Sequence, residues 1–207
     1  MIFANEEQTE EELSAEEVAK VMAAIGEEEP PMMGLGGDLT ETAAQNLAMA
    51  LLQFNAGRIR ATVDDFDEED EDIEFYISSG GGSVNDMFGV YDLMNIVKIH
   101  RDIATFGFGK IYSAAVPLLA NGTKGKRYIG RNTRLMIHHC STSASGTQPD
   151  MRTTFQEMKV VEDMMVQAIA DNTDLSVGEI YNMLSKNTDE FFSAEDALEM
   201  GLVDEII

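Results

Sequence analysis

The chain has 207 residues, of which 44% are hydrophobic, and this suits a single globular domain with a sizeable core. Its formal net charge of −24 argues against nucleic acids and anionic membranes as partners, because these surfaces carry charge of the same sign. No run approaches the roughly 18 uninterrupted apolar residues of a membrane-spanning helix, and the N-terminus lacks the basic and apolar regions of a secretory signal. Because the single cysteine, Cys140, excludes an internal disulfide, we expect a cytoplasmic protein.

The negative charge is concentrated in two stretches. Residues 1–29 hold ten glutamates and one lysine, and the run 64–72 holds eight acidic residues. Blocks of like charge are usually solvated, so we interpret both stretches as solvated segments. The first also predicts one helix, capped by Ser14, that ends before a pair of prolines. We therefore expect residues 1–31 to be an N-terminal appendage, either a propeptide or a docking tail, ahead of a domain at 32–207.

The apolar pattern of the remaining chain predicts strands that alternate with helices. Short apolar runs bounded by glycines are typical of buried strands, and apolar residues three and four apart are typical of helices. In chain order we expect a strand at 32–37, a helix at 40–54, a strand at 73–78, a helix at 84–97, a strand at 102–109, a helix at 113–122, strands at 125–130 and 133–138, helices at 150–173, 176–186 and 193–200, and a last strand at 202–206. This alternation predicts an α/β fold with right-handed crossovers and a mostly parallel sheet.

Three polar loops directly follow predicted strands. They are "SSGGGSV" at 78–84, "GFGKIYSAA" at 107–115 and "HHCSTS" at 138–143. In parallel sheets, active sites collect where the carboxyl ends of the strands meet. We therefore expect the three loops to converge on one site.

Two side chains in these loops, Ser113 and His138, form a candidate nucleophile and base. Ser113 lies between a strand and a helix, where a serine is often only an N-cap. It becomes a nucleophile only if a base lies within hydrogen-bond reach, and His138 ends a neighbouring strand at the same edge of the sheet. A lone buried histidine is more often structural, so both interpretations stay open.

The run Gly80–Gly82 allows backbone conformations that can point N–H groups at a carbonyl oxygen.

The sequence predicts neither a metal nor a cofactor. His139 faces away from its neighbour His138 in an extended segment, and Cys140 has no second cysteine to complete a zinc site. The glycine run matches neither the phosphate-loop pattern nor the dinucleotide-binding pattern. The glycines are better interpreted as an oxyanion loop and a ledge for a peptide.

Four blocks of the sequence resemble, in order, the signature blocks of the ClpP-type serine peptidases. They are "FYISSGGGSV", "GFGKIYSAAVPLLANGTKGKRY", "NTRLMIHHC" and "DEFFSAEDALEMGLVDEII", which span residues 73–207, with a weaker similarity in "GLGGDLTETAAQNLAMALLQF". The resemblance implies a crotonase/ClpP-like spiral of mostly parallel β-strands with flanking helices. It also implies a protruding helical handle at about 139–173.

The resemblance assigns roles to individual residues. It implies that Ser113 is the nucleophile, that His138 is the general base and that Asp189 orients the histidine. The oxyanion hole would be formed by the N–H groups of Gly82 and Ala114. Substrate contacts would come from a small set of residues near these positions: Gly81, Ser83, Gly146 and Thr147. His139 and Cys140 would be ordinary residues of the loop beyond the site.

The resemblance also implies an assembly and partners. Members form stacked heptameric rings, a tetradecamer, around a chamber, and the segment 141–150 would pair with an extended polypeptide substrate. An AAA+ unfoldase normally feeds the chamber, and because this chain has no nucleotide motif, its own hydrolysis would be ATP-independent. The chain departs from the family at Gly80, where a proline is usual, and at Ala114, where a methionine is usual. These departures fit a phage or otherwise divergent member.

Several alternatives remain open on the sequence alone. A phage prohead-type maturation protease would share the fold, and a non-catalytic ring subunit would keep the fold without the chemistry. A serine–lysine dyad enzyme would use Lys110 in place of His138. An acyl-CoA-processing crotonase would use the oxyanion hole without Ser113 as the nucleophile.

Overall fold

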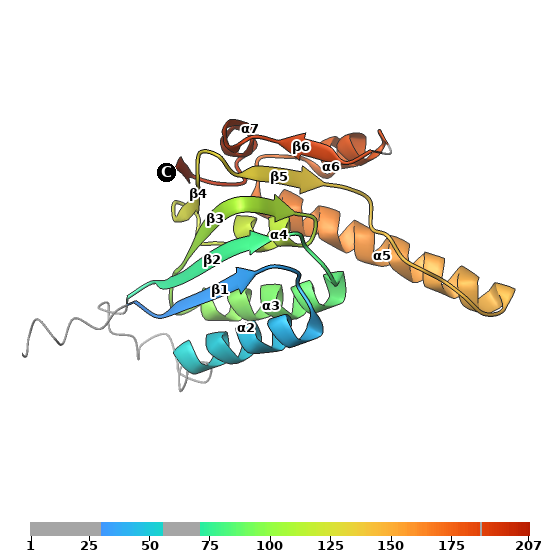
Figure 1. Ribbon diagram of the computed structural model, residues 1–207, viewed down its shortest axis with the longest axis horizontal. Helices are drawn as coiled ribbons and strands as arrows, with labels where there is room; N and C mark the ends of the chain where they lie inside the picture. Colours follow the sequence, from blue (N-terminus) through green and yellow to red (C-terminus); the bar gives the residue numbers. More distant parts are fainter. Residues whose placement is uncertain (1–29, 56–70, 187) are drawn as a thin grey trace, which may run out of the picture. The chain divides into compact units, whose positions relative to one another are not determined.

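The computed structural model describes residues 30–55 and 71–207, except residue 187. Residues 31–207 form one unit, which Figure 1 shows as a twisted sheet with helices packed against it. The helix expected after Ser14 and most of the acidic run 64–72 lie outside the described residues. No helix of the described part is both long and apolar enough to span a bilayer.

The described residues form a seven-stranded sheet that is parallel at every pairing except one. The path β1-β2-β3-β4-β7 runs across it, while β5 pairs with β3 and carries β6 on its other side. The strands are β1 (Met32–Gly36), β2 (Ile73–Ser79), β3 (Ile103–Tyr112), β4 (Arg127–Ile129), β5 (Arg134–Ile137), β6 (Glu190–Phe192) and β7 (Glu205–Ile206). The predicted α/β fold with a mostly parallel sheet is confirmed.

Six helices of the described chain connect these strands. They are α2 (Glu41–Phe54), α3 (Val84–Val97), α4 (Ala115–Ala120), α5 (Gln148–Asn172), α6 (Val177–Leu184) and α7 (Ala194–Glu199). Most begin at a serine or threonine whose hydroxyl accepts a backbone N–H, as the capping rules lead us to expect: Thr40, Ser83, Thr147, Ser176 and Ser193. The structure therefore confirms the six helices that the sequence predicted from residue 40 onward, with small shifts at their ends.

The core lies between the sheet and helices α2, α3 and α4. β2 alternates strictly, with Ile73, Phe75 and Ile77 buried beneath α3 and α4. Each fully buried side chain of this size contributes roughly 1.5–3 kcal/mol relative to an exposed one. Helix α5 behaves differently, because only its last third is buried, and Figure 1 shows the rest extending away from the sheet.

Strand β3 ends three residues later than the sequence predicted. Ile77 of β2 pairs with Gly107, but Ser79 pairs with Ile111, so β3 has extra residues between the two pairs. Gly109, with φ of 68°, allows this bulge. The sequence predicts that the strand ends at this glycine. Before the bulge β3 pairs with β4, and after it β3 pairs with β5. The bulge therefore directs the end of β3 toward β5, where the candidate site lies.

Strand β6 was not predicted, because three half-exposed residues give no alternation long enough to read. It pairs antiparallel with β5 and matches Ile137 to Glu190.

One part of the acidic run also differs from the prediction. Asp72 is not simply solvated, since its carboxylate lies 2.7 Å from Lys126 Nζ, which also contacts Asp102.

Candidate active site

Ser113 occupies a tight turn between β3 and α4. Its φ of 54° is the only positive value of a non-glycine residue in the described chain. The turn is held by two backbone hydrogen bonds, from Ser113 N–H to the Met136 carbonyl at 2.8 Å and from Val116 N–H to the Ser113 carbonyl at 3.0 Å. Helix α4 is capped by Ala114 without a side-chain hydrogen bond, so the N-cap interpretation of Ser113 is wrong. The strained turn leaves the hydroxyl available for another partner.

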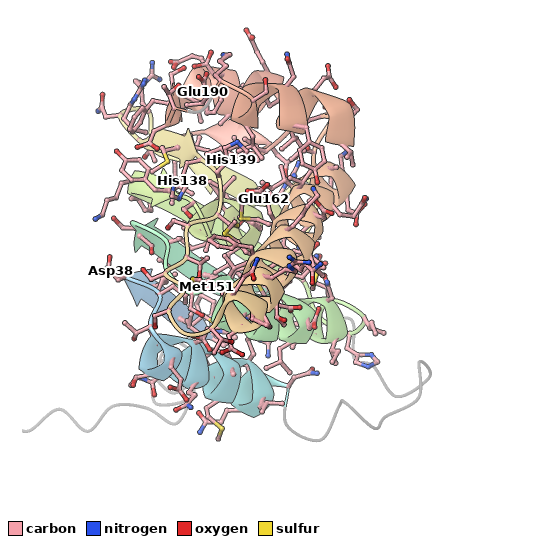
Figure 2. All side chains as sticks on the ribbon, turned by 90° about the vertical axis from the view of Figure 1, so that its right-hand side faces the viewer. Asp38, His138, His139, Met151, Glu162 and Glu190 are labelled. Atoms are coloured by element: carbon pink, nitrogen blue, oxygen red, sulfur yellow. The ribbon has the colours of Figure 1, made fainter. Side chains whose placement is uncertain are left out.

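That partner is His138, which follows the last residue of β5. The parallel ladder pairs Tyr112 with Met136, so the residues just beyond the two strand ends emerge side by side. The His138 Nε2 atom lies 2.8 Å from Ser113 Oγ, within hydrogen-bond distance. Figure 2 shows His138 and His139 at the end of the sheet that faces α5. The structure thus brings together the serine and the histidine that the sequence singled out.

Asp189 lies on the other side of His138. The antiparallel β5–β6 register that matches Ile137 to Glu190 places the preceding residue, Asp189, opposite His138. Its Oδ1 atom is 3.9 Å from His138 Nδ1, which is an ion-pair distance rather than a hydrogen bond, and its side chain is 55% exposed. The arrangement is that of a serine–histidine–aspartate site in which the carboxylate is loosely engaged.

The glycine ledge, Gly80–Gly82, packs directly against the serine turn. A Cβ added to Gly81 would lie 2.6 Å from the Tyr112 carbonyl oxygen and 2.8 Å from Ser113 Cβ. A Cβ added to Gly82 would lie 2.2 Å from the Leu39 carbonyl oxygen, because Gly82 forms a parallel bridge with Leu39. These close approaches explain why both positions need glycine.

Two backbone N–H groups, one in the glycine ledge and one directly after Ser113, have no acceptor among the described residues. Gly81 N–H donates to Ser79 Oγ, and Ser83 N–H donates to the Leu39 carbonyl. In contrast, neither Gly82 N–H nor Ala114 N–H makes a hydrogen bond within the part of the chain that the structure describes. An unused N–H group beside a serine hydroxyl can bind an oxyanion.

A groove of about 780 Å³ adjoins the ledge. It is lined by Gly82 and Ser83 with the start of α3, by the segment 140–142, and by polar and apolar residues of α5 such as Glu157 and Met158. Ser83 also caps α3, so its position is fixed by that helix. An extended peptide laid in this groove would have backbone on either side of it.

The other predicted substrate residues occupy different places. Gly81 packs against the Ser113 turn, while Thr147 caps α5 and forms a capping box with Asp150. Gly146 precedes the cap with φ of 126°. Neither Gly146 nor Thr147 is among the described residues that line the groove.

Sequence reasoning missed a contact just beyond His138. The Glu162 carboxylate of α5 accepts from His139 Nδ1 at 2.9 Å and from the Cys140 N–H at 3.0 Å. Burial, together with the charge of Glu162, raises the pKa of the Cys140 thiol to about 11. No motif marks this pair, because the two contacting segments are more than twenty residues apart and carry no spacing pattern. The interpretation of His139 and Cys140 as ordinary loop residues therefore omitted their connection to α5.

A serine–lysine dyad and a metal site are two alternatives that can be compared with the geometry. For the dyad, Lys110 on β3 has its Nζ atom beside Gly80, 3.4 Å from the position that a Cβ on Gly80 would take. The Ser113 hydroxyl instead contacts His138. Within the described residues, no group of three or more histidine, cysteine or carboxylate side chains is arranged to hold a metal.

The chain is similar in sequence to known proteins. The sequence model of the Clp protease family matches residues 32–207. A curated relative, the "ATP-dependent Clp protease proteolytic subunit 2" of Frankia casuarinae, is 36% identical over 141 residues. The aligned region covers 68% of this chain and 63% of the relative, so the chain spans less than two thirds of that protein's length.

Proposed function

Because the chain belongs to the Clp protease family, we propose that it is a serine endopeptidase subunit that hydrolyses unfolded polypeptides or peptides through an acyl-enzyme intermediate. The observation that carries the proposal is the 2.8 Å contact between Ser113 Oγ and His138 Nε2 at the end of two paired strands. A serine hydroxyl becomes a useful nucleophile when a base lies at this distance.

In the proposed reaction, Ser113 Oγ attacks the carbonyl carbon of the scissile peptide bond while His138 Nε2 accepts the hydroxyl proton. The tetrahedral intermediate collapses as the C–N bond breaks, and His138 returns the proton to the leaving amine. Water then attacks the ester with His138 again as the base, which releases the new carboxylic acid and restores Ser113. These steps use the same atoms in the same order as other serine–histidine peptidases.

We assign the oxyanion hole to Gly82 N–H and Ala114 N–H. Ala114 directly follows Ser113, and Gly82 follows Gly81, which packs against the Ser113 turn; neither N–H has an acceptor within the described residues. Donors that are already oriented stabilise the negative charge of the intermediate without reorganisation, and removal of one typically costs about 10²–10³ in rate.

Asp189 is assigned the role of orienting the His138 imidazole. Its carboxylate faces Nδ1, so it favours the tautomer that has the proton on Nδ1 and a free lone pair on Nε2. A lone pair on Nε2 is what the base needs in order to accept the proton of Ser113. The long distance and the exposure of Asp189 indicate a weaker hold than a buried carboxylate would give.

The substrate is proposed to bind as an extended strand between the glycine ledge and residues 141–147. Residues 148–150 of the segment expected from the sequence form the first turn of α5 and cannot pair with a strand. Gly82, Ser83 and residues 140–142 line the same groove, which supports this placement. Residues 138–145 form no regular secondary structure, so their backbone groups can pair with an added strand. Gly81 supports the ledge, and Gly146 and Thr147 are proposed to contact the more distant part of the chain.

The assembly and partners are proposed from family membership. We propose stacked heptameric rings with α5 and residues 139–173 as the handle, an AAA+ unfoldase that feeds the chamber, and a cytoplasmic location. The name of the curated relative, an ATP-dependent proteolytic subunit, supports a partner that supplies ATP hydrolysis. Residues 1–31 are proposed to be an appendage to this domain.

Hydrolysis of a fluorogenic peptide in the absence of nucleotide tests the proposal. We expect turnover by the wild-type protein, none by Ser113→Ala or His138→Ala, and wild-type turnover by Ser185→Ala, a serine at the end of α6. Activity that survives His138→Ala but not Lys110→Ala would favour the serine–lysine mechanism. An assembled wild-type protein without turnover would favour a non-catalytic ring subunit.

A further inference from the structure

The backbone around His138 is fixed unequally on its two sides. On the N-terminal side, β5 is paired with both β3 and β6, so Met136 belongs to two ladders and Ile137 to the ladder with β6. On the C-terminal side, residues 138–145 belong to no helix or strand. Something other than a ladder must hold the chain as it leaves the site.

The Glu162 carboxylate provides such a contact. A single oxygen, Oε2, accepts from His139 Nδ1 at 2.9 Å and from the backbone N–H of Cys140 at 3.0 Å. The Glu162 side chain is only 14% exposed, whereas that of Asp189 is 55% exposed. In Figure 2 the labels of His138, His139 and Glu162 lie together where the β5 end meets α5. The two residues after the proposed base, His139 and Cys140, are therefore each attached to α5 by one hydrogen bond.

These hydrogen bonds restrict the conformation of the chain at His138. An ionised carboxylate only accepts, so the contact requires a proton on His139 Nδ1. Charge-assisted hydrogen bonds of this type are stronger than neutral ones and have more strictly defined geometry. The loose contact with Asp189 restrains the His138 ring only weakly. The position of Nε2 relative to Ser113 therefore depends more on the backbone conformation at His138 than on Asp189.

We propose that Glu162 is a positioning residue for catalysis, which holds the His138 imidazole in register with Ser113 by anchoring His139 and Cys140 to α5. The inference rests on the proposed function, since it concerns the rate of the Ser113 reaction. The Glu162 hydrogen bonds also connect α5 to the site, so that a movement of α5 relative to the sheet would displace His138.

Replacement of Glu162 provides the test, with peptide hydrolysis resolved into kcat and KM. Glu162→Ala removes both hydrogen bonds, and we expect kcat to fall by roughly tenfold to a hundredfold, as small misplacements of catalytic groups do. KM for a short peptide should change less than kcat, because Glu162 itself does not line the groove among the described residues and acts on it only through Cys140. Glu162→Gln keeps a side-chain oxygen that can accept the Cys140 N–H, and it should restore most of kcat.

Cys140 supplies a second readout that is independent of activity. It is the only cysteine, so the rate of alkylation by iodoacetamide as a function of pH reports the pKa of this one thiol. The pKa of about 11 is raised by burial and by the Glu162 charge. Both Glu162→Ala and Glu162→Gln should therefore shift the alkylation midpoint to lower pH, although only Glu162→Ala lowers kcat strongly.

The neighbouring residue Asp163 provides a matched control. Its carboxylate accepts from Tyr181 Oη and pairs with Lys159 at 3.3 Å, so it connects α5 to α6, and among the described residues it makes no hydrogen bond or ion pair with the 138–140 segment. We expect Asp163→Ala to keep the wild-type kcat and the wild-type alkylation midpoint. Thermal unfolding and light scattering of each variant establish that folding and assembly are retained. If Glu162→Ala does not assemble, His139→Ala, which removes one of the two hydrogen bonds, should still lower kcat severalfold.

The outcomes separate the inference from the proposed function. A wild-type kcat in Glu162→Ala would overturn the positioning role. If Glu162→Ala does not assemble, a wild-type kcat in His139→Ala would overturn it instead. Equal losses of kcat in Glu162→Ala and Glu162→Gln would also overturn it, since a hydrogen-bond anchor predicts rescue by glutamine. A wild-type protein that hydrolyses nothing would overturn the proposed function and the positioning role with it. In that case a shifted Cys140 midpoint in both Glu162 variants would still show that the contact itself exists.

Discussion

His138 Nε2 and Ser113 Oγ lie 2.8 Å apart although 25 positions separate the two residues in the chain. The contact depends on the parallel ladder between β3 and β5, which pairs Tyr112, one residue before Ser113, with Met136, two residues before His138. It also depends on the bulge at Gly109, which separates the part of β3 that pairs with β4 from the part that pairs with β5. The chemistry proposed for the site therefore depends on backbone features at some distance from the two side chains.

Gly81→Ala should abolish most of the peptidase activity. The added Cβ would lie 2.6 Å from the Tyr112 carbonyl oxygen, and φ of 84° is unfavourable for alanine, so the Ser113 turn must shift. We expect kcat to fall by about 10² or more, comparable to the loss of an oxyanion-hole donor. Gly89→Ala in α3 is the matched control, because its added Cβ meets nothing within 4 Å and should leave kcat unchanged. Activity of Gly81→Ala equal to that of Gly89→Ala would contradict the packing described here.

Ala114→Pro should eliminate the second donor of the proposed oxyanion hole. Ala114 has φ of −60°, which proline can adopt, but proline has no N–H group and also restricts the preceding Ser113. We expect kcat to fall by at least about 10²–10³, measured with the same fluorogenic peptide. A variant that is folded and fully active would move the oxyanion hole away from Ala114.

Asp189→Ala should be less damaging than the loss of a buried triad aspartate. The Asp189 carboxylate is exposed and 3.9 Å from His138, so solvent screens the interaction. We expect kcat to decrease by roughly fivefold to tenfold rather than by the approximately 10⁴-fold seen for a buried, hydrogen-bonded aspartate. Glu190→Gln, a change at the neighbouring position, should leave kcat unaltered. A loss near 10⁴-fold in Asp189→Ala would show that the carboxylate holds the imidazole far more tightly than this geometry indicates.

Lys98 gives the stability of the fold a predictable pH dependence. Burial, together with the charge of Arg127, lowers its pKa in the folded protein from 10.5 to about 8. Between these two values the unfolded chain binds more protons than the folded one, so the Lys98 contribution to the free energy of unfolding rises with pH. Below pH 8 Lys98 is protonated in both the folded and the unfolded protein, so the unfolding free energy is lowered by the full cost of burying its charge.

Lys98→Met provides the measurement, because methionine does not titrate. Urea unfolding of both proteins at pH 7, 8, 9 and 10 gives the difference in unfolding free energy at each pH. The variant also loses the hydrogen bonds from Lys98 Nζ to Asn121, which adds a constant offset. We expect wild-type stability to rise relative to the variant above pH 8, and a difference that is flat across the series would refute the lowered pKa.

The fold was largely predictable because its elements are long and regular. Helices α2 and α3 have clear apolar periodicity and side-chain caps, and β2 alternates over its whole length. The strand ends were less predictable. Gly109 looks like the end of β3 in the sequence, but its positive φ produces a bulge that the neighbouring strands decide. β6 is too short to give a pattern and exists because β5 offers it an edge.

The site was predictable where residue type and strand end coincide, as at Ser113 and His138. The geometry of Asp189 could not be read from the chain, because both its distance from His138 and its exposure depend on the position of β6. The contact of Glu162 was also missed. It joins a long helix to a loop, and α5 carries many other carboxylates that the sequence does not distinguish from Glu162.

The most direct test of the account is labelling of the purified protein with a serine-reactive fluorophosphonate, followed by peptide mapping. The account predicts a single adduct on Ser113 Oγ that is absent in Ser113→Ala and lost or greatly slowed in His138→Ala, since the probe requires a hydroxyl activated by a neighbouring base. A well-folded, assembled protein that acquires no adduct, or acquires it with undiminished rate in His138→Ala, would contradict the serine–histidine mechanism.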